Sequence, residues 1–261
     1  DGGSPITEYT ATSSPGGLTG TLGQAGSGYI FVSGLANGTA YTFNVTATNV
    51  AGTSTSSATS NSVTPLADPV ASVINPITGT IWMDRNLGAT QVATSSTDAD
   101  SYGDLYQWGR GADGHQLRTS ATTATLSSTD TPGHGDFILP PSSPYDWRNP
   151  QNGPFLWQGV NGVNNPCPSG YRLPTEAELN EERLSWISND AEGAYASPLK
   201  LPVARWRHLG NGSLTVVCSH GNYWSSTVFG TNSRYLNFRP RKADMLNNLR
   251  AIGFSVRCIK D

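Results

Sequence analysis

The chain is poor in charge and has no long hydrophobic run. Charged residues make up 13% of its 261 residues and the formal net charge is −3, whereas an ordinary soluble domain has about 25% charged residues. This balance excludes nucleic-acid binding by bulk electrostatics. No apolar run approaches the roughly 18–20 residues that a transmembrane helix needs. No heptad pattern survives the frequent Gly and Pro residues, so a coiled coil is excluded as well.

Lysine and arginine are absent from the first part of the chain. All 16 of them lie from Arg85 onwards, and all seven Trp lie from Trp82 onwards. Residues 1–66 are instead rich in Gly, Ser and Thr, which excludes a helical bundle and fits either a flexible linker or a set of short strands. Alternating apolar positions in the run that starts at Tyr41, together with turn residues such as Asn37-Gly38, favour strands.

Part of this segment resembles a known β-sandwich. Residues 35–52 (LANGTAYTFNVTATNVAG) are similar to the E–F region of a fibronectin type III domain, in which Tyr41 would be the corner tyrosine that bonds back across the turn. Residues 1–10 (DGGSPITEYT) resemble its B–C loop and strand C. The resemblance implies a partial domain over residues 1–65 whose first two strands would precede Asp1, so we expect a fragment of a larger polypeptide. Residues 66–76, with Pro69 and Pro76, are interpreted as a linker.

The second part, residues 77–261, combines short strands, long loops and one well-signalled helix. Thr175 and Glu178 form a capping-box pattern just after Pro174. We therefore expect a helix that begins there and ends within residues 188–193. Strands are expected at residues 79–84, 214–218, 235–238 and 252–258.

Five motifs in this part occur in the order of a known family. They are WMDRNLG (82–88), YGDLYQW (102–108), PCPSGYRLPT (166–175), YWSST (223–227) and GFSVRC (253–258). Together they resemble the Fibrobacter succinogenes major paralogous domain, which is similar to the formylglycine-generating-enzyme branch of C-type-lectin-like folds. The resemblance implies an α+β domain with long loops over residues 77–261, in a bacterial or phage protein displayed outside the cytoplasm. Fold alone does not imply a function.

Three cysteines leave two interpretations open. They could be reduced thiols of a cytoplasmic protein, or one disulfide and one free thiol in an extracellular one. The fibronectin-like neighbour favours the second interpretation. We predict a bond between Cys167, which precedes the expected helix, and Cys258 in the last strand, because it would tie the chain end to the body of the domain. Cys218 is then expected to be a buried free thiol.

Candidate catalytic and metal-binding residues are sparse. The three cysteines are far apart in sequence, so the close pair used by formylglycine-generating enzymes is missing. His134 and Asp136 lack further metal ligands nearby, and Ser219 and His220 would point to opposite faces of a strand. Asp98, Asp100 and Asp104 could hold a structural Ca²⁺ ion, but they lack the Gly and Glu of an EF-hand loop, so a solvated acidic loop is the favoured interpretation. We therefore expect neither an enzyme nor a cofactor.

The most unusual segment is residues 220–261, with seven basic and two acidic residues. Alternation places Leu236 and Phe238 in the core and their odd-numbered neighbours outside, where Tyr, Asn and Arg side chains suit recognition. An ordinary basic face is the alternative. The predicted binding surface comprises Asn222, Tyr223, Phe229, Tyr235, Asn237, Arg239, Arg241, Asn247 and Asn248. The same segment resembles the variable region of proteins diversified by diversity-generating retroelements, which implies a binding surface that varies.

These observations predict an extracellular, cell-surface or phage-borne ligand-binding module, such as an adhesin. A fibronectin-like stalk would carry a lectin-like head that binds a protein or glycan on another cell or particle. We expect no nucleic-acid partner and no membrane insertion of this fragment. The alternatives are a structural display module without a dedicated ligand and, less favoured, an enzyme on the formylglycine-generating-enzyme scaffold.

Overall fold

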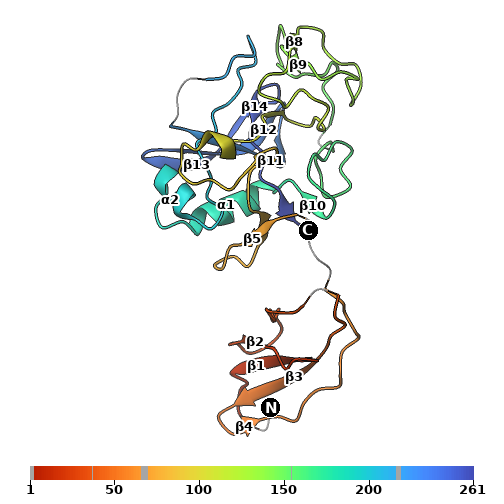
Figure 1. Cartoon of the computed structure of the whole chain (residues 1–261), viewed down its shortest axis with the longest axis vertical. Coiled ribbons are helices and arrows are strands. Elements are labelled where there is room, and N and C mark those ends of the chain that lie inside the picture. The colour runs from red at the N-terminus through yellow and green to blue at the C-terminus, as the bar shows by residue number, and fades with distance from the viewer. Residues whose placement is uncertain (1–2, 37, 66–69, 154, 216–218) are drawn as a thin grey trace. The chain divides into compact units, whose positions relative to one another are not determined.

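The computed structural model describes residues 3–36, 38–65, 70–153, 155–215 and 219–261. The chain divides into two compact units, Asp1–Pro69 and Val70–Asp261, whose elements are shown in Figure 1. It is mainly β, as expected: the described residues hold many short strands and two short α-helices. Within this part of the chain, no helix has both the length and the apolar character needed to cross a membrane.

The first unit contains an antiparallel sheet in the order β2-β1-β3-β4. Its strands are β1 (Glu8–Ser14), β2 (Thr19–Leu22), β3 (Thr42–Asn49) and β4 (Gly52–Thr53). Tyr41 is buried, and its hydroxyl oxygen accepts a hydrogen bond from the Ala36 N–H at 3.0 Å. This is the contact expected of a corner tyrosine.

A serine-rich segment runs along β3 through a contact repeated every three residues. Ser54, Ser57 and Ser60 each donate their backbone N–H to a carbonyl of β3. Each also accepts, on its side-chain oxygen, the N–H of the same β3 residue. The partners on β3 are Ala47, Val45 and Phe43. Every three residues of the serine-rich segment thus match two residues of β3. The serine hydroxyl oxygens accept the β3 N–H groups that the backbone of this segment would leave without a hydrogen-bond partner.

The described residues of the second unit form four small sheets. Their orders are β10-β15-β6-β5, β11-β12-β13, β14-β7 and β8-β9. The strands are β5 (Ser72–Ile74), β6 (Ile81–Met83), β7 (Tyr106–Gln107), β8 (Thr122–Thr123), β9 (Phe137–Ile138), β10 (Tyr171–Arg172), β11 (Gly221–Phe229), β12 (Asn232–Arg239), β13 (Lys242–Leu249), β14 (Gly253–Phe254) and β15 (Ile259–Lys260). Only β8 and β9 among these described strands pair in parallel.

Strand β5 shows that the predicted linker, residues 66–76, extends too far along the chain at its C-terminal end. It lies inside residues 66–76 and pairs with β6, Ser72 opposite Met83 and Ile74 opposite Ile81. The prolines that suggested a linker flank this strand and do not interrupt it. Residues 70–76 therefore belong to the second unit, and residues 66–69 lie outside the described part.

Two α-helices lie beside the three-stranded sheet (Figure 1). Helix α1 (Glu176–Leu184) begins where the capping box predicts: Thr175 Oγ accepts the Glu178 N–H at 3.3 Å, and the Glu178 carboxylate accepts the Thr175 N–H at 2.7 Å. It ends at Leu184, earlier than expected, and a second helix, α2 (Ala191–Ala196), starts at the Asp190 cap. A 3₁₀ turn, η1 (Ala99–Ser101), lies in the loop after β6.

Strands β11 and β12 contribute side chains to two hydrophobic cores. Tyr235 and Trp224 lie in one core with Phe254. Leu236 and Tyr223, the neighbours of these residues in sequence, lie in the other core, which also contains Leu179 of α1. Because successive side chains of a strand point to opposite faces, this part of the sheet is covered on both faces.

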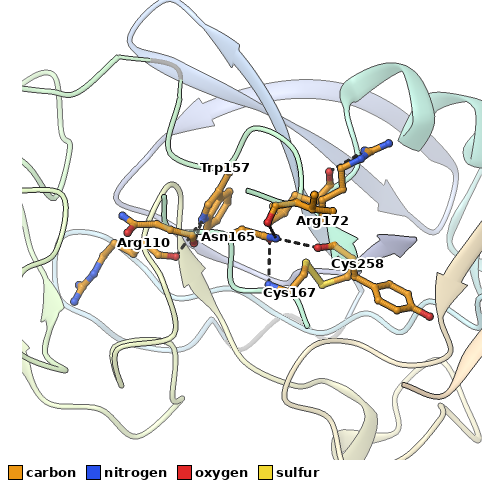
Figure 2. The surroundings of a disulfide bond; sticks show 10 residues. Arg110, Trp157, Asn165, Cys167, Arg172 and Cys258 are labelled. Carbon is orange, nitrogen blue, oxygen red and sulfur yellow. Dashed lines mark hydrogen bonds between the residues drawn. A yellow bond between two sulfur atoms is a disulfide. The ribbon is translucent and has the colours of Figure 1, made fainter. Parts of the chain in front are cut away.

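A disulfide joins Cys167 and Cys258, as predicted. Figure 2 shows its surroundings. The side-chain oxygen of Asn165 accepts the Cys167 N–H at 3.2 Å, while its amide nitrogen donates to the Tyr171 carbonyl at 2.9 Å. Since Tyr171 belongs to β10, which pairs with β15, the bond fastens the last strand to the body of the unit. Cys218, expected as a free thiol, lies outside the described residues.

Candidate ligand-binding surface

The nine residues predicted to bind a ligand do not share one exposed patch. At least partly exposed are Phe229, Arg239, Arg241, Asn247 and Asn248. The other four are buried, and none of them is more than 7% exposed: Asn222, Tyr223, Tyr235 and Asn237. The prediction of a single solvent-facing surface is therefore wrong for these last four residues.

The physical reason is that successive side chains of β12 point alternately into two different hydrophobic cores, and not alternately into a core and into solvent. The Tyr235 ring lies 4.6 Å from that of Phe254, measured between centroids, in one core. Leu236 lies in the other core. When a strand is buried on both faces, the alternation of its side chains does not show which of them face solvent.

Two of the buried amides belong to a polar row that crosses the sheet. Asn237 donates its side-chain amide to the Asn222 oxygen at 2.9 Å, and Asp244 is the next residue across, on β13. The row adjoins the turn between β12 and β13, called here the basic turn, which carries Arg239, Arg241 and Lys242. Asp244 lies 3.0 Å from the Lys242 ammonium and 3.8 Å from the Arg239 guanidinium.

A second group of polar and aromatic side chains lies near the start of α1. Phe229 is 50% exposed, and the guanidinium carbon of Arg234 stands 4.0 Å from the centroid of its ring. Arg234 also lies 3.4 Å from the Glu176 carboxylate on α1. Nearby on the sheet, the Asn232 amide donates to the Asn247 oxygen at 2.8 Å. This pair leaves the Asn232 oxygen and the Asn247 amide nitrogen available to a ligand.

A shallow depression of about 480 Å³ adjoins this group. It is lined by Thr175, Glu176, Ala177, Asn180, Thr227 and Met245. The depression and the four sheet residues Phe229, Asn232, Arg234 and Asn247 are called here the α1-side surface. An aromatic ring, a guanidinium, a carboxylate and two amides can together stack on a ligand and hydrogen-bond to it without a metal.

Sequence reasoning placed Phe229 and Asn247 in a binding surface but missed Arg234. Arg234 lies two residues before Leu236 on the same face of β12, which the alternation assigns to the core. Its side chain is nevertheless 24% exposed, because the core beneath α1 does not extend to this end of the strand. Its contact with Glu176 joins residues 58 positions apart in sequence, so local sequence could not show it.

Two basic residues of the 220–261 segment are structural. Arg257 is 2% exposed, and its guanidinium donates to the Asn86 side-chain oxygen and to the Leu199 carbonyl. Burial lowers the pKa of Arg257 to about 10. Arg250 is also buried, with its guanidinium carbon 4.4 Å from the centroid of the Trp108 ring. The exposed basic residues of this segment are thus those of the basic turn and Lys260, with Arg234 partly exposed.

One pair, a buried histidine and a solvent-accessible carboxylate, has the appearance of a catalytic dyad. The Nδ1 atom of His115 lies 2.6 Å from the Asp113 carboxylate, and its Nε2 accepts the Gln107 N–H at 3.1 Å. Burial lowers the pKa of His115 to about 4, so the neutral ring donates from Nδ1. Both ring nitrogens are thereby engaged inside the protein, and the pair braces the loop after β7.

The other candidates for chemistry remain isolated. Ser219 and His220 lie outside the strands, and Ser219 Oγ is 2.9 Å from His220 Nδ1, which corrects the expectation that they point apart. Asp98 caps η1 by accepting the Asp100 N–H. Across the described residues, no group of three or more His, Cys, Asp or Glu side chains is placed to hold a metal ion.

Comparisons of the chain with protein-family models, curated proteins and solved structures find no match. The function is therefore argued from the surfaces of the second unit.

Proposed function

We propose that the chain is an extracellular, cell-surface or phage-borne ligand-binding module. In this proposal, a fibronectin-type-III-like unit carries a C-type-lectin-like unit that binds its ligand through the α1-side surface. The disulfide between Cys167 and Cys258 supports a location outside the reducing cytoplasm.

The observation that carries the proposal is the pair formed by the exposed Phe229 and the partly exposed Arg234 beside the depression at the start of α1. Aromatic and arginine side chains dominate the energetics of recognition sites. Here the guanidinium is held between the ring and the Glu176 carboxylate. A ligand therefore meets side chains that are already ordered, which reduces the entropic cost of binding.

The proposal is tested by removing this pair. The full chain is screened against a glycan array and a displayed library of random decapeptides. We expect the double variant Phe229→Ala, Arg234→Ala to bind the selected ligands at least tenfold more weakly, a loss of about 1.4 kcal/mol or more. Its melting temperature should change by only a few degrees, because the lost contacts are largely external.

A matched control removes another aromatic–cation pair of the same unit. Lys200 stands over the Tyr195 ring, with its ammonium 5.0 Å from the ring centroid, and the double variant Tyr195→Ala, Lys200→Ala should bind as the unaltered chain does. Equal losses in both variants would contradict the proposed location. No binding in either screen would favour the alternative function, a structural display module, which the burial of four predicted contact residues also supports.

A further inference from the structure

The edge of the three-stranded sheet next to the α1-side surface is open. β13 pairs with β12 on one side and is the last strand in the order β11-β12-β13. In an antiparallel pair, alternate residues direct both backbone groups to the partner strand. The two-residue turn makes Arg239 and Lys242 a bonded pair. The backbone groups of Ala243, Met245, Asn247 and Leu249 consequently point away from β12.

The ends of this edge are occupied and its middle is not. The Arg183 guanidinium donates to the Ala243 carbonyl at 3.4 Å, and the Ile252 N–H donates to the Leu249 carbonyl at 3.2 Å. Among the described residues, none forms a backbone hydrogen bond with the outward N–H and C=O groups of Met245 and Asn247. These two residues thus offer four bonds to one added antiparallel strand.

The charges beside this edge select against a second copy of the chain. The basic turn carries three positive charges, and Asp244 is the acidic residue paired with two of them. An antiparallel copy centred on Leu246 would place no acidic residue opposite Lys242, because the residue there would be Arg250, which is buried and lies 3.8 Å from Asp146. A parallel copy would place the two basic turns side by side. Like charges in such positions oppose pairing, whereas an acidic segment would be attracted.

We propose that β13 binds an extended, acidic peptide segment of a partner protein by strand addition. Leu246, which is 36% exposed, shares a face of the sheet with Lys242, so an apolar residue opposite Leu246 and an acidic residue opposite Lys242 lie on one face of the peptide. In the antiparallel direction the acidic residue follows the apolar one by four positions. The side chains between them alternate toward the α1-side surface.

This inference rests on the proposed function and specifies its ligand as a peptide. The test uses the full chain, the library of random decapeptides and the glycan array. We expect the selected peptides to share an apolar residue followed four positions later by Asp or Glu. Lys242→Glu should change the preference at that position from acidic to basic residues. A bound peptide should slow hydrogen exchange of the Met245 and Asn247 amides at least tenfold.

A pair of variants at one position separates the backbone from the side chain. Met245→Pro removes an outward N–H on an edge strand, where proline is tolerated, and should weaken peptide binding at least tenfold more than Met245→Ala does. Melting curves check that both variants are folded, and the Lys242→Glu result and the exchange rates do not depend on proline.

Three results would overturn the inference: no selected peptides, selected peptides indifferent to Lys242→Glu and Met245→Pro, or self-association through β13. Glycan binding that is lost in the Phe229→Ala, Arg234→Ala variant would overturn the peptide inference and leave the proposed function standing.

Discussion

At the scale of single residues, buried polar side chains in the second unit bind backbone groups of its short strands and of its loops. Arg257 binds carbonyls of two separate segments, and His115 accepts the Gln107 N–H. The corner contact of Tyr41 could be predicted because its sequence context is local. The roles of His115 and Arg257 could not, since their partners become neighbours only after folding.

The His115–Asp113 pair predicts how stability depends on pH. The pKa of His115 lies near 4 in the folded chain and near 6.5 when unfolded. Between these values the unfolded state binds more protons, so the stability contributed by the neutral ring is lost as pH falls from about 6.5 to about 4. We expect His115→Gln to be less stable than the unaltered chain at pH 7. Its unfolding free energy should depend less on pH in this window, by on the order of 3 kcal/mol.

Urea unfolding between pH 4 and pH 7 measures this difference. Burial raises the pKa of Asp104 to about 6, and this group makes the unfolding free energy rise as pH falls, opposite to the effect of His115. Only the difference in pH dependence between the unaltered chain and the variant therefore reports on His115. His134→Gln, at an exposed position, is the control and should keep the original pH dependence. An unchanged slope in His115→Gln would contradict the assignment.

At the scale of secondary structure, elements with a local start signal were predictable and those defined by their neighbours were not. The capping box at Thr175 marks the start of α1. Helix α2 is only six residues long and lacks a clear apolar period. The strands around Leu236 were expected, but the alternation could not show which face meets solvent, because both faces pack against other segments.

The cap at Thr175 is expected to stabilise the second unit and to position Glu176 beside Arg234. Thr175→Ala removes the hydroxyl that accepts the Glu178 N–H and should lower the unfolding free energy by about 1 kcal/mol. Thr175→Ser keeps the hydroxyl and should cost far less. Urea unfolding of the two variants compares them. Equal losses would show that the methyl group, and not the capping bond, is responsible.

At the scale of the whole molecule, the mainly β character and the disulfide follow from composition and motif order. The linker bounds do not, because proline-rich sequence looks alike whether it flanks a strand or forms a tether. Pro69 and Pro76 lie on either side of β5, whose pairing partner β6 is identified only by the fold.

The disulfide should matter for the second unit alone. Its cysteines are 91 residues apart, and closing a loop of this length contributes roughly 4–5 kcal/mol in the chain-entropy model, less in practice. We expect the double variant Cys167→Ser, Cys258→Ser to lower the melting temperature of the second unit. Scanning calorimetry of the full chain measures it, with any transition of the first unit as an internal reference. An unchanged second-unit transition would contradict this expectation.

The same bond makes residues 167–258 a covalent ring. Both α-helices and all of β11, β12 and β13 lie inside it, and so does every residue of the α1-side surface and of the basic turn. A protease that cuts one peptide bond in a loop of this ring opens it without releasing a fragment. The two pieces of the surface stay attached, and the cut becomes visible as separate chains only after a reductant is added.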